Sequence, residues 1–522
     1  MNLKKLWKEW GNTVVAFFLI TAAAFALRFI NLVDQPIFAD EAIYIRWAQV
    51  MRVEPTLRFL PLLDGKQPLF MWSIVPFLKF FNDPLFAGRF VSVLTGLGSL
   101  LGIFVATYLL FKSKKAALVA SFIYAISPFS IFFDRMALVD SMLSMFGIWT
   151  FVGVVVTART LRLDVAMITG FLLGFSLLTK STALFYVLLL PLALLIVNLK
   201  KTKKKTVKIT SLLKVVLLFA SSVIIAYGMY NILRLGPNFQ LLSQRNFDYV
   251  YPYSHVLTSP FDPFEPFIQR IFQYLIILGP GLLAVLLVLG VLSGFRKYRK
   301  QIIFVALWWL LPTLLVAEFS RTMTTRYVLF TFPYLVILAS LGIMHVKENF
   351  RKIFVIGLIL FIFQAVNSDR LILSNLESAN LPRSERSGYL EEWTAGTGIK
   401  EIADYIKDVQ KQNPDRKIVV GTEGYFGTLP DALQIYLNKD PKITVIGIGL
   451  ELDHVSDRLI NSRDAGNLTY LVANNERLFA NPQDLGLKTL AAYPKAVRPD
   501  GSRQTLLLFE VGEDAVSPKS PK

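Results

Sequence analysis

The sequence predicts an α-helical protein that crosses a membrane many times and ends in a small soluble α/β domain. Of its 522 residues, 54% are hydrophobic, and apolar runs close to a bilayer's thickness recur along the first 366 positions. Basic residues gather in short clusters between those runs. A helix of roughly 20 apolar residues crosses the hydrocarbon core of a bilayer. We therefore expect about 11 transmembrane helices in this part of the chain.

The predicted spans share their length and their apolar character. They cover residues 11–32, 85–110, 116–133, 138–158, 165–179, 182–199, 211–231, 274–295, 301–318, 327–346 and 353–367. The first apolar run continues to Ile30, which favours an uncleaved span over a signal peptide.

The basic clusters indicate how the chain is oriented. If Lys4, Lys5 and Lys8 lie in the cytoplasm, every later cluster falls on the same side of the membrane, as the positive-inside rule requires. These clusters lie at 112–115, 159–162, 200–205, 295–300 and 347–352. The net charge of +18 then reflects membrane topology, and no nucleic-acid partner is expected. We predict an integral protein of a bacterial plasma membrane, with the N-terminus cytoplasmic and the C-terminal domain extracytoplasmic.

Three regions follow from this topology. Residues 1–366 form the transmembrane domain, with long outer loops at 33–84 and 232–273. Residues 367–511 alternate a helix-like stretch at 398–411 with short β-rich runs, which is typical of an α/β domain. Residues 512–522 have the composition of a disordered tail.

The chain has no cysteine, which excludes disulfides and thiolate sites. The glycine-rich GTEGYFG at 421–427 does not match the dinucleotide fingerprint.

An acidic pair, Asp40 and Glu41, follows the first span. One interpretation is that Asp40 caps a helix at 41–52, as an aspartate before a helix commonly does. The other is catalytic. The two interpretations are compatible, because an N-cap fixes a carboxylate in a defined place.

Further ionisable residues gather at the outer ends of several spans or in the outer loops. They are Arg28, Asp64, Lys66, Arg135, Asp140, Lys180, Arg245, Arg321 and Arg326. Charges at membrane depth are costly and are functional candidates. The alternative for each one is a side chain that snorkels to the interface. Their convergence on one face favours a site.

These pieces resemble the multi-span glycosyltransferases of the GT-C type that take sugars from polyprenyl-phosphate carriers, such as protein O-mannosyltransferases and the lipid A aminoarabinose transferase. The matching stretches are ADEAIY, DGKQPLFMW, AGRFVSVLTGL, RMALVDS, LLTKSTALF and RYVLFTFPYL, spread over most of residues 28–335. At GKQP the lipid A enzymes carry Glu before the Lys, whereas this chain has Gly65, so the resemblance does not fix the role of Asp64.

The resemblance implies a transfer to an acceptor hydroxyl with inversion at the anomeric carbon and with Asp40 as the general base. Glu41 and Asp140 would complete the catalytic group by orienting the acceptor or binding a cation. A sugar phosphate has a good leaving group, so cations that stabilise the departing phosphate suit this chemistry. The predicted substrate-binding residues are Arg28, Asp64, Lys66, Arg135, Lys180, Arg245, Arg321, Arg326 and Tyr327.

The sequence does not identify a cofactor, and it leaves open a divalent cation held by Asp40 and Asp140. The expected partners are a polyprenyl-phosphate-linked sugar, an acceptor that is a protein, a glycan or a lipid, and membrane lipids. The alternative function is a polytopic transporter or lipid flippase. That alternative predicts charges in mid-span and inverted halves, whereas the charges here lie at the outer ends of the spans.

Overall fold

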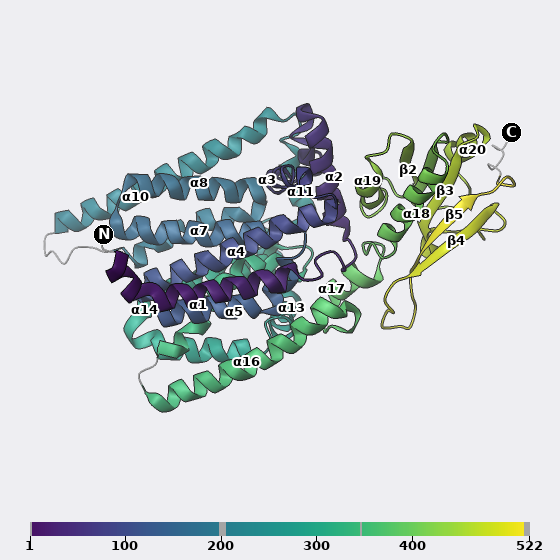
Figure 1. Ribbon diagram of the computed structural model, residues 1–522. Coiled ribbons are helices and arrows are strands. Elements are labelled where there is room, and N and C mark those ends of the chain that lie inside the picture. Colours follow the sequence, from purple (N-terminus) through teal and green to yellow (C-terminus); the bar gives the residue numbers. More distant parts are fainter. Residues whose placement is uncertain (1–2, 198–204, 345–346, 516–522) are drawn as a thin grey trace. The chain divides into compact units, whose positions relative to one another are not determined.

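A computed structural model of the chain describes residues 3–197, 205–344 and 347–515, which form two compact units (Figure 1). Unit 1 comprises Met1–Ile30, Thr56–Ser73 and Arg89–Pro382. Unit 2 comprises Asn31–Pro55, Ile74–Gly88 and Arg383–Lys522. Two parts of the predicted first outer loop therefore group with the C-terminal domain rather than with the transmembrane helices.

Unit 1 is helical throughout its described part. Its longer helices are α1 (Leu3–Phe29), α4 (Pro84–Phe111, whose first turn belongs to unit 2), α5 (Lys114–Ile126), α7 (Val139–Thr160), α8 (Leu163–Thr179), α10 (Lys205–Tyr230), α13 (Phe264–Ile277), α14 (Leu282–Phe319) and α16 (Glu348–Ser374). Shorter helices connect or extend these: η2 (Leu60–Asp64), α3 (Leu69–Ile74), α6 (Pro128–Phe133), η4 (Ser181–Ala183), α9 (Leu184–Leu189), η5 (Leu190–Leu195), α11 (Leu241–Tyr249), α12 (His255–Thr258), η7 (Thr325–Thr331), α15 (Phe332–Ala339) and η8 (Ser340–Met344).

Within the described residues, seven helical segments are long and apolar enough to cross a membrane. The predicted class, a polytopic helical membrane protein with a small sheet domain, is confirmed. Each predicted span coincides with helical structure, but not always with one continuous helix. The span predicted at 116–133 is divided into α5 and α6, because Pro128 begins a new helix. The span predicted at 274–295 begins in α13 and continues in α14, which also contains the span predicted at 301–318 and is bent at Tyr298.

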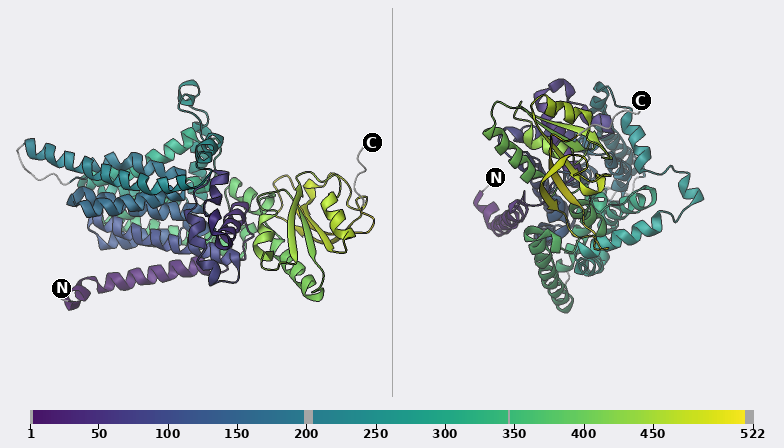
Figure 2. Two further views of the ribbon diagram at one scale, coloured as in Figure 1. Left: turned by 90° about the horizontal axis from the view of Figure 1, so that it is seen from above. Right: turned by 90° about the vertical axis from the view of Figure 1, so that its right-hand side faces the viewer.

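Figure 2 shows the helices of unit 1 from two further directions. Small residues allow some of these helices to pack closely. A Cβ atom on Gly170 of α8 would lie 2.7 Å from the backbone oxygen of Ser222 in α10. A Cβ atom on Gly153 of α7 would lie 2.4 Å from Oγ1 of Thr169 in α8. Neither position has room for a side chain, so glycine is what brings α7, α8 and α10 together.

Unit 2 contains a sheet whose described strands follow the order β2-β1-β3-β5-β4. The strands are β1 (Ile418–Glu423), β2 (Ile443–Gly449), β3 (Leu468–Asn474), β4 (Leu487–Pro494) and β5 (Thr505–Val511). Strand β1 pairs in parallel with β2 and with β3, in the registers Ile418↔Ile443 and Ile418↔Leu468. Strand β5 pairs antiparallel with both β3 and β4. The β-rich runs in the sequence predicted β1, β2, β3 and β5.

Helices α18 (Ile399–Gln412), α19 (Asp431–Leu437) and α20 (Asp457–Asp464) accompany this sheet. Alternating apolar residues of β3 and β5, such as Leu471 and Phe509, bury one face together with Leu459 of α20. Ala515 also belongs to this core, so the first part of the predicted disordered tail is ordered. Residues 516–522 of that tail lie outside the described residues, as does most of the basic run at 200–205.

Helix α2 (Ala39–Val53) belongs to unit 2 because it packs on α19. The side chain of Gln49 donates a hydrogen bond of 2.9 Å to the backbone oxygen of Ile435. Arg46 Nε donates to Gln434 Oε1 over 3.0 Å. These bonds join the outer-loop helix to the C-terminal domain, which explains why the boundary predicted at residue 366 does not describe the compact units.

Candidate functional site

The acidic pair lies in the first turn of α2, where carboxylates interact favourably with the helix dipole. The N-cap is Phe38, so the predicted capping role of Asp40 is wrong. Glu41 closes the helix end instead: its Oε2 accepts a 3.0 Å hydrogen bond from the backbone N–H of Phe38. Glu41 is fully buried, whereas Asp40 is partly exposed. The structure thus gives Glu41 a structural role and leaves Asp40 as the accessible acid of the pair.

In unit 1, the loop that follows η2 and helix α11 form a first charged cluster. Lys66 Nζ lies 3.2 Å from Asp64 Oδ2, and Arg245 Nη2 lies 3.5 Å from Asp64 Oδ1. Arg245 also pairs with Asp248 at 2.9 Å. Asp64 is therefore the carboxylate that holds a lysine and an arginine from distant parts of the sequence in one place.

A second charged cluster forms where α7, α8 and η7 meet. Lys180 Nζ lies 2.7 Å from Asp140 Oδ1, and the same ammonium lies 4.8 Å from the centre of the Tyr327 ring. The guanidinium of Arg326, the residue before Tyr327 in η7, lies 5.8 Å from the centre of that ring. The other carboxylate oxygen of Asp140 is buried and, among the described residues, has no hydrogen-bond partner.

A side-chain hydrogen bond joins the two clusters. Gln67 Nε2, next to Lys66, donates over 2.7 Å to Oγ of Ser181, next to Lys180. The two lysines are thereby held at adjoining positions. We call Lys66, Lys180 and Arg245 the cation group. Sequence reasoning missed Gln67 and Ser181, although both stand beside predicted lysines in the quoted motifs.

Gly65 explains how α11 reaches this loop. Its φ is +61°, in the left-handed region that favours glycine. A Cβ atom there would lie 2.4 Å from Cβ of Arg245 and 2.8 Å from the backbone oxygen of Leu241. This chain has glycine where the lipid A enzymes have glutamate. The close approach of α11 accounts for the glycine, because α11 occupies the space that a glutamate side chain would need.

The structure places two predicted substrate ligands away from solvent. Arg28 is fully buried, with Nε 3.0 Å from Asp134 Oδ2 and Nη1 donating to the backbone oxygen of Ala125. Arg135 Nη1 donates to the backbone oxygens at the end of α1, including that of Ile30. Both arginines therefore tie the C-terminal end of α1 to neighbouring segments, and their binding of substrate stays a prediction.

Arg321 lies beside the cation group rather than within it. Its guanidinium is 5.1 Å from the centre of the Tyr251 ring, and its backbone N–H donates to the backbone oxygen of Tyr249 over 2.9 Å. Tyr249 accepts a 3.3 Å hydrogen bond from Arg245 Nη2. The aromatic residues Tyr249 and Tyr251 thus connect Arg321 to α11.

No group of three or more His, Cys, Asp or Glu side chains suited to holding a metal occurs within residues 3–197, 205–344 and 347–515. Asp40 and Asp140 belong to different units. Asp140 is instead paired with the ammonium of Lys180, which is a cation already in place.

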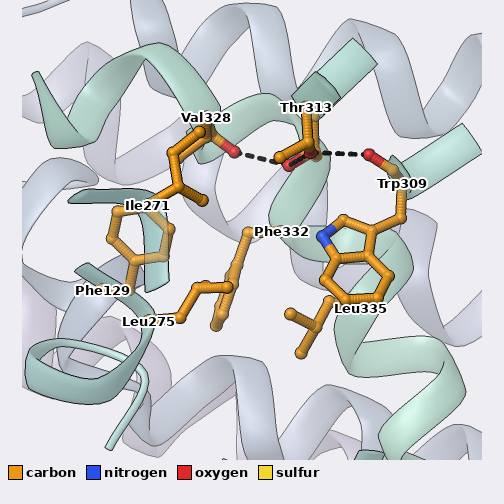
Figure 3. A pocket seen from close by; sticks show the side chains of 9 residues that line it. Phe129, Ile271, Leu275, Trp309, Thr313, Val328, Phe332 and Leu335 are labelled. Carbon is orange, nitrogen blue, oxygen red and sulfur yellow. Dashed lines mark hydrogen bonds between the residues drawn. The ribbon is translucent and has the colours of Figure 1, made fainter. Parts of the chain in front are cut away.

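A small pocket in unit 1 is lined by Phe129, Ile271, Leu275, Trp309, Thr313, Val328, Thr331, Phe332 and Leu335 (Figure 3). Thr313 Oγ1 donates to the backbone oxygen of Trp309 over 2.7 Å, and Thr331 Oγ1 donates to that of Val328 over 2.8 Å. Helix carbonyls thus satisfy both hydroxyls, and the lining, as far as the described chain goes, carries no ionisable group. This pocket is apolar packing, so the polar chemistry belongs to the charged clusters.

Comparison with known proteins agrees with this fold. A family model described as dolichyl-phosphate-mannose-protein mannosyltransferase matches residues 65–225, which contain Lys66, Asp140 and Lys180. No curated protein sequence matches the chain. The structure is similar to ArnT from Cupriavidus metallidurans bound to undecaprenyl phosphate, with a TM-score of 0.57 at 15% identity, covering 96% of this chain and 99% of that one.

Archaeoglobus fulgidus oligosaccharyltransferase has a similar fold. Its apo form gives a TM-score of 0.52 at 11% identity, covering 97% of this chain and 75% of that one. The same enzyme tethered to an acceptor peptide gives 0.51 at 11% identity, covering 99% and 76%. The predicted resemblance to the GT-C type is confirmed at the level of the fold.

Proposed function

We propose that this integral membrane protein, which has the GT-C fold, transfers a sugar from a polyprenyl-phosphate carrier to an acceptor hydroxyl on the extracytoplasmic face. The observation that carries the proposal is the cation group: Lys66, Lys180 and Arg245 are drawn together by Asp64, Asp140 and the Gln67–Ser181 hydrogen bond. The family model and the ArnT fold, which was solved with undecaprenyl phosphate, support the same class of donor.

The cation group suits a phosphate that carries a sugar on one oxygen and a polyprenyl chain on another. Ammonium and guanidinium donors make short, charge-assisted hydrogen bonds to phosphate oxygens. As the anomeric C–O bond breaks, negative charge develops on the departing phosphate. Fixed cations stabilise this charge without having to reorganise. The phosphate would bind donors of these cations that Asp64 and Asp140 do not use, while the two carboxylates keep the cations aligned.

Asp40 is the proposed general base. It takes the proton of the acceptor hydroxyl while that oxygen attacks the anomeric carbon from the face opposite the phosphate. One C–O bond forms, the C–O bond to phosphate breaks, and the carrier leaves as polyprenyl phosphate. A single displacement of this kind inverts the anomeric configuration.

A lipid carrier also accounts for the protein's being in a membrane, because the polyprenyl chain stays in the bilayer while its phosphate reaches the outer ends of the helices. The family description favours mannose or a related hexose as the sugar. The positive-inside pattern favours the outer leaflet of a bacterial plasma membrane.

The test uses full-length protein in nanodiscs with a radiolabelled polyprenyl-phosphate mannose and an extract of membrane acceptors. Asp40→Asn keeps the size of the side chain and removes the base, so transfer should fall by roughly 10²- to 10⁴-fold. Asp34→Asn, at an exposed carboxylate of the same loop, is the matched control and should retain transfer. Lys66→Met should raise the KM for the donor.

Equal transfer by Asp40→Asn and wild type, with both correctly folded, would remove Asp40 from the proposal. Transfer by neither wild type nor control, across acceptors of all three classes, would remove the glycosyltransferase activity itself.

A further inference from the structure

Exposed apolar side chains gather on one edge of the sheet in unit 2. Tyr425 and Phe426 follow β1, Leu450 follows β2, and Phe479 comes shortly after β3; these side chains are between 46% and 67% exposed. Strands β1, β2 and β3 run parallel, so their carboxyl ends share this edge. We call it the carboxyl edge. Exposed apolar groups concentrated in one place mark an interaction site more often than scattered ones do.

The strand connections single out one point on this edge. From β1 the chain passes through α19 to β2 on one side, and from β2 it passes through α20 to β3 on the other side of β1. The boundary between β1 and β3 is therefore a topological switch point. In open α/β sheets, ligands bind outside the carboxyl ends of the strands at such a point.

Two buried polar residues lie at this point. Glu423 ends β1 and Asn474 ends β3, and they are 5% and 2% exposed. Glu423 Oε1 accepts a 2.7 Å hydrogen bond from Nδ2 of Asn474, and its Oε2 accepts one from the backbone N–H of Asn474. The side-chain carbonyl of Asn474 is buried and, in the described part of the chain, has no hydrogen-bond partner. An unpartnered buried acceptor costs stability and calls for an explanation such as a ligand.

More charged groups continue this polar cluster. Arg498 Nη2 lies 2.7 Å from Glu392 Oε2, and its Nη1 pairs with Glu476, which lies two residues after the end of β3. Lys495 Nζ donates to the backbone oxygen of Glu392 over 2.9 Å. Burial lowers the pKa of Lys495 to about 7, with Glu423 acting in the opposite direction. The carboxyl edge thus combines carboxylate, amide and guanidinium groups beneath the exposed rings.

The rings are held in place from both sides. Trp47 of α2 is buried, and its ring centre lies 5.8 Å from that of Phe426. Gly427 has a φ of +115°, and a Cβ atom there would lie 3.2 Å from Cζ3 of Trp393, which is 41% exposed. Trp393 directly follows Glu392 of the polar cluster. The aromatic groups and the polar groups are therefore neighbours on one surface.

From these contacts we propose that the carboxyl edge, with Tyr425, Phe426 and Trp393 as its rings and Glu423, Asn474 and Arg498 as its polar groups, binds a saccharide of the acceptor. Sugar rings present an apolar C–H face that stacks on aromatic rings, and a rim of hydroxyls that bonds to carboxylates, amides and guanidinium groups. Sites of this kind have aromatic walls and a few fixed polar groups. A bilayer would match the rings but would leave the buried Asn474 carbonyl unpartnered.

This inference rests on the proposed function, because it supplies the acceptor for that reaction. Helix α2 connects the two. Asp40 and Trp47 are two turns apart on α2, about 10 Å along its axis and on the same side of the helix. A saccharide anchored at Phe426, against Trp47, would direct the rest of the acceptor along α2 towards the proposed base.

The test measures binding to an array of immobilised oligosaccharides, using full-length wild-type protein in detergent with a C-terminal affinity tag. The oligosaccharide that binds most tightly is then titrated into the protein in solution, and binding is followed by intrinsic tryptophan fluorescence. Tyr425→Ala combined with Phe426→Ala should weaken its Kd at least tenfold. Asn474→Leu should weaken it as well. Tyr405→Ala removes an exposed tyrosine of α18 and is the matched control, with an unchanged Kd.

Absence of binding to the whole array, or binding that the ring and Asn474 variants leave unchanged, would overturn the proposal. Binding of the protein only to vesicles of phosphatidylglycerol and phosphatidylethanolamine through these rings would overturn it in favour of a membrane contact. Asp40→Asn separates this inference from the proposed function, since it should lose sugar transfer but keep saccharide binding. Saccharide binding without transfer by the wild type would leave the carboxyl edge as a lectin-like site and remove the reaction.

Discussion

Lys180 Nζ lies 2.7 Å from Asp140 Oδ1, while the second carboxylate oxygen of Asp140 is buried without a hydrogen-bond partner in the described part of unit 1. The buried carboxylate orients an ammonium that is itself about a quarter exposed. This arrangement fits a positioning residue that aims a cation at a ligand, because the ammonium keeps donors that Asp140 does not use.

Asp140→Asn should therefore reduce the kcat for sugar transfer by about 10- to 100-fold, as expected from the loss of a charge-assisted hydrogen bond of about 1.5–3 kcal/mol. The KM for the donor should change less. The measurement is steady-state kinetics with varied donor. If Asp140 only stabilised the fold, the variant would have a lower melting temperature, and its folded fraction would keep the wild-type kcat. That result would contradict the role of Asp140 in positioning Lys180.

Gly65→Ala should weaken donor binding. The substitution places a Cβ atom against Cβ of Arg245 and imposes a positive φ on alanine, which costs about 1–2 kcal/mol. Helix α11 must then move away from the loop, and Arg245 leaves the cation group. The KM for the donor should rise about tenfold, with a weaker dependence on ionic strength. Gly228→Ala is the control, because a Cβ there meets no atom within 4 Å. Equal KM values for both variants would show that Arg245 does not depend on Gly65.

The sequence was sufficient to predict the helical membrane character and the fold class, because long apolar runs are local signals. The sequence could not show that Arg135 and Lys180 make different contacts, since each residue lies near the end of a predicted span. The difference depends on which carbonyls and carboxylates the packed helices bring close. For the same reason Gln67 was missed: its role depends on Ser181, far away in the sequence. The grouping of α2 with the C-terminal domain also depends on long-range contacts such as Gln49 with Ile435.

The buried ion pair between Arg28 and Asp134 allows a test of whether Arg28 stabilises the fold or binds the substrate. Both side chains are fully buried, and Asp134 Oδ1 also accepts a 2.6 Å hydrogen bond from Ser141. Arg28→Met leaves the Asp134 carboxylate without its partner and should destabilise the protein by about 3–5 kcal/mol. Adding Asp134→Asn should restore much of this loss, because it removes the uncompensated charge. Thermal unfolding in detergent measures both effects. Wild-type stability of the single variant, with a raised KM for the donor, would assign Arg28 to the substrate site.

The buried carboxyl group of Asp431 in α19 should make the stability of unit 2 depend on pH. Burial raises the pKa of this carboxyl to about 6, although the backbone N–H of Gly427, 2.8 Å from its Oδ2, and the Arg46 guanidinium act in the opposite direction. The folded state therefore keeps a proton that the unfolded state loses near pH 4, so the contribution of Asp431 to stability should fall as the pH rises from about 4 to about 6 and stay level above that. The difference between the two pKa values corresponds to about 3 kcal/mol.

Asp431→Asn should abolish that fall, because the amide cannot ionise and its oxygen can still accept from Gly427. The measurement is the melting temperature of the full chain between pH 4 and pH 8, followed by the fluorescence of Trp393 after the other seven tryptophans are replaced by phenylalanine. Asp415→Asn, at an exposed carboxylate of the same unit, is the control and should keep the wild-type profile. A profile that falls equally in the wild type and Asp431→Asn would assign the pH dependence to another group.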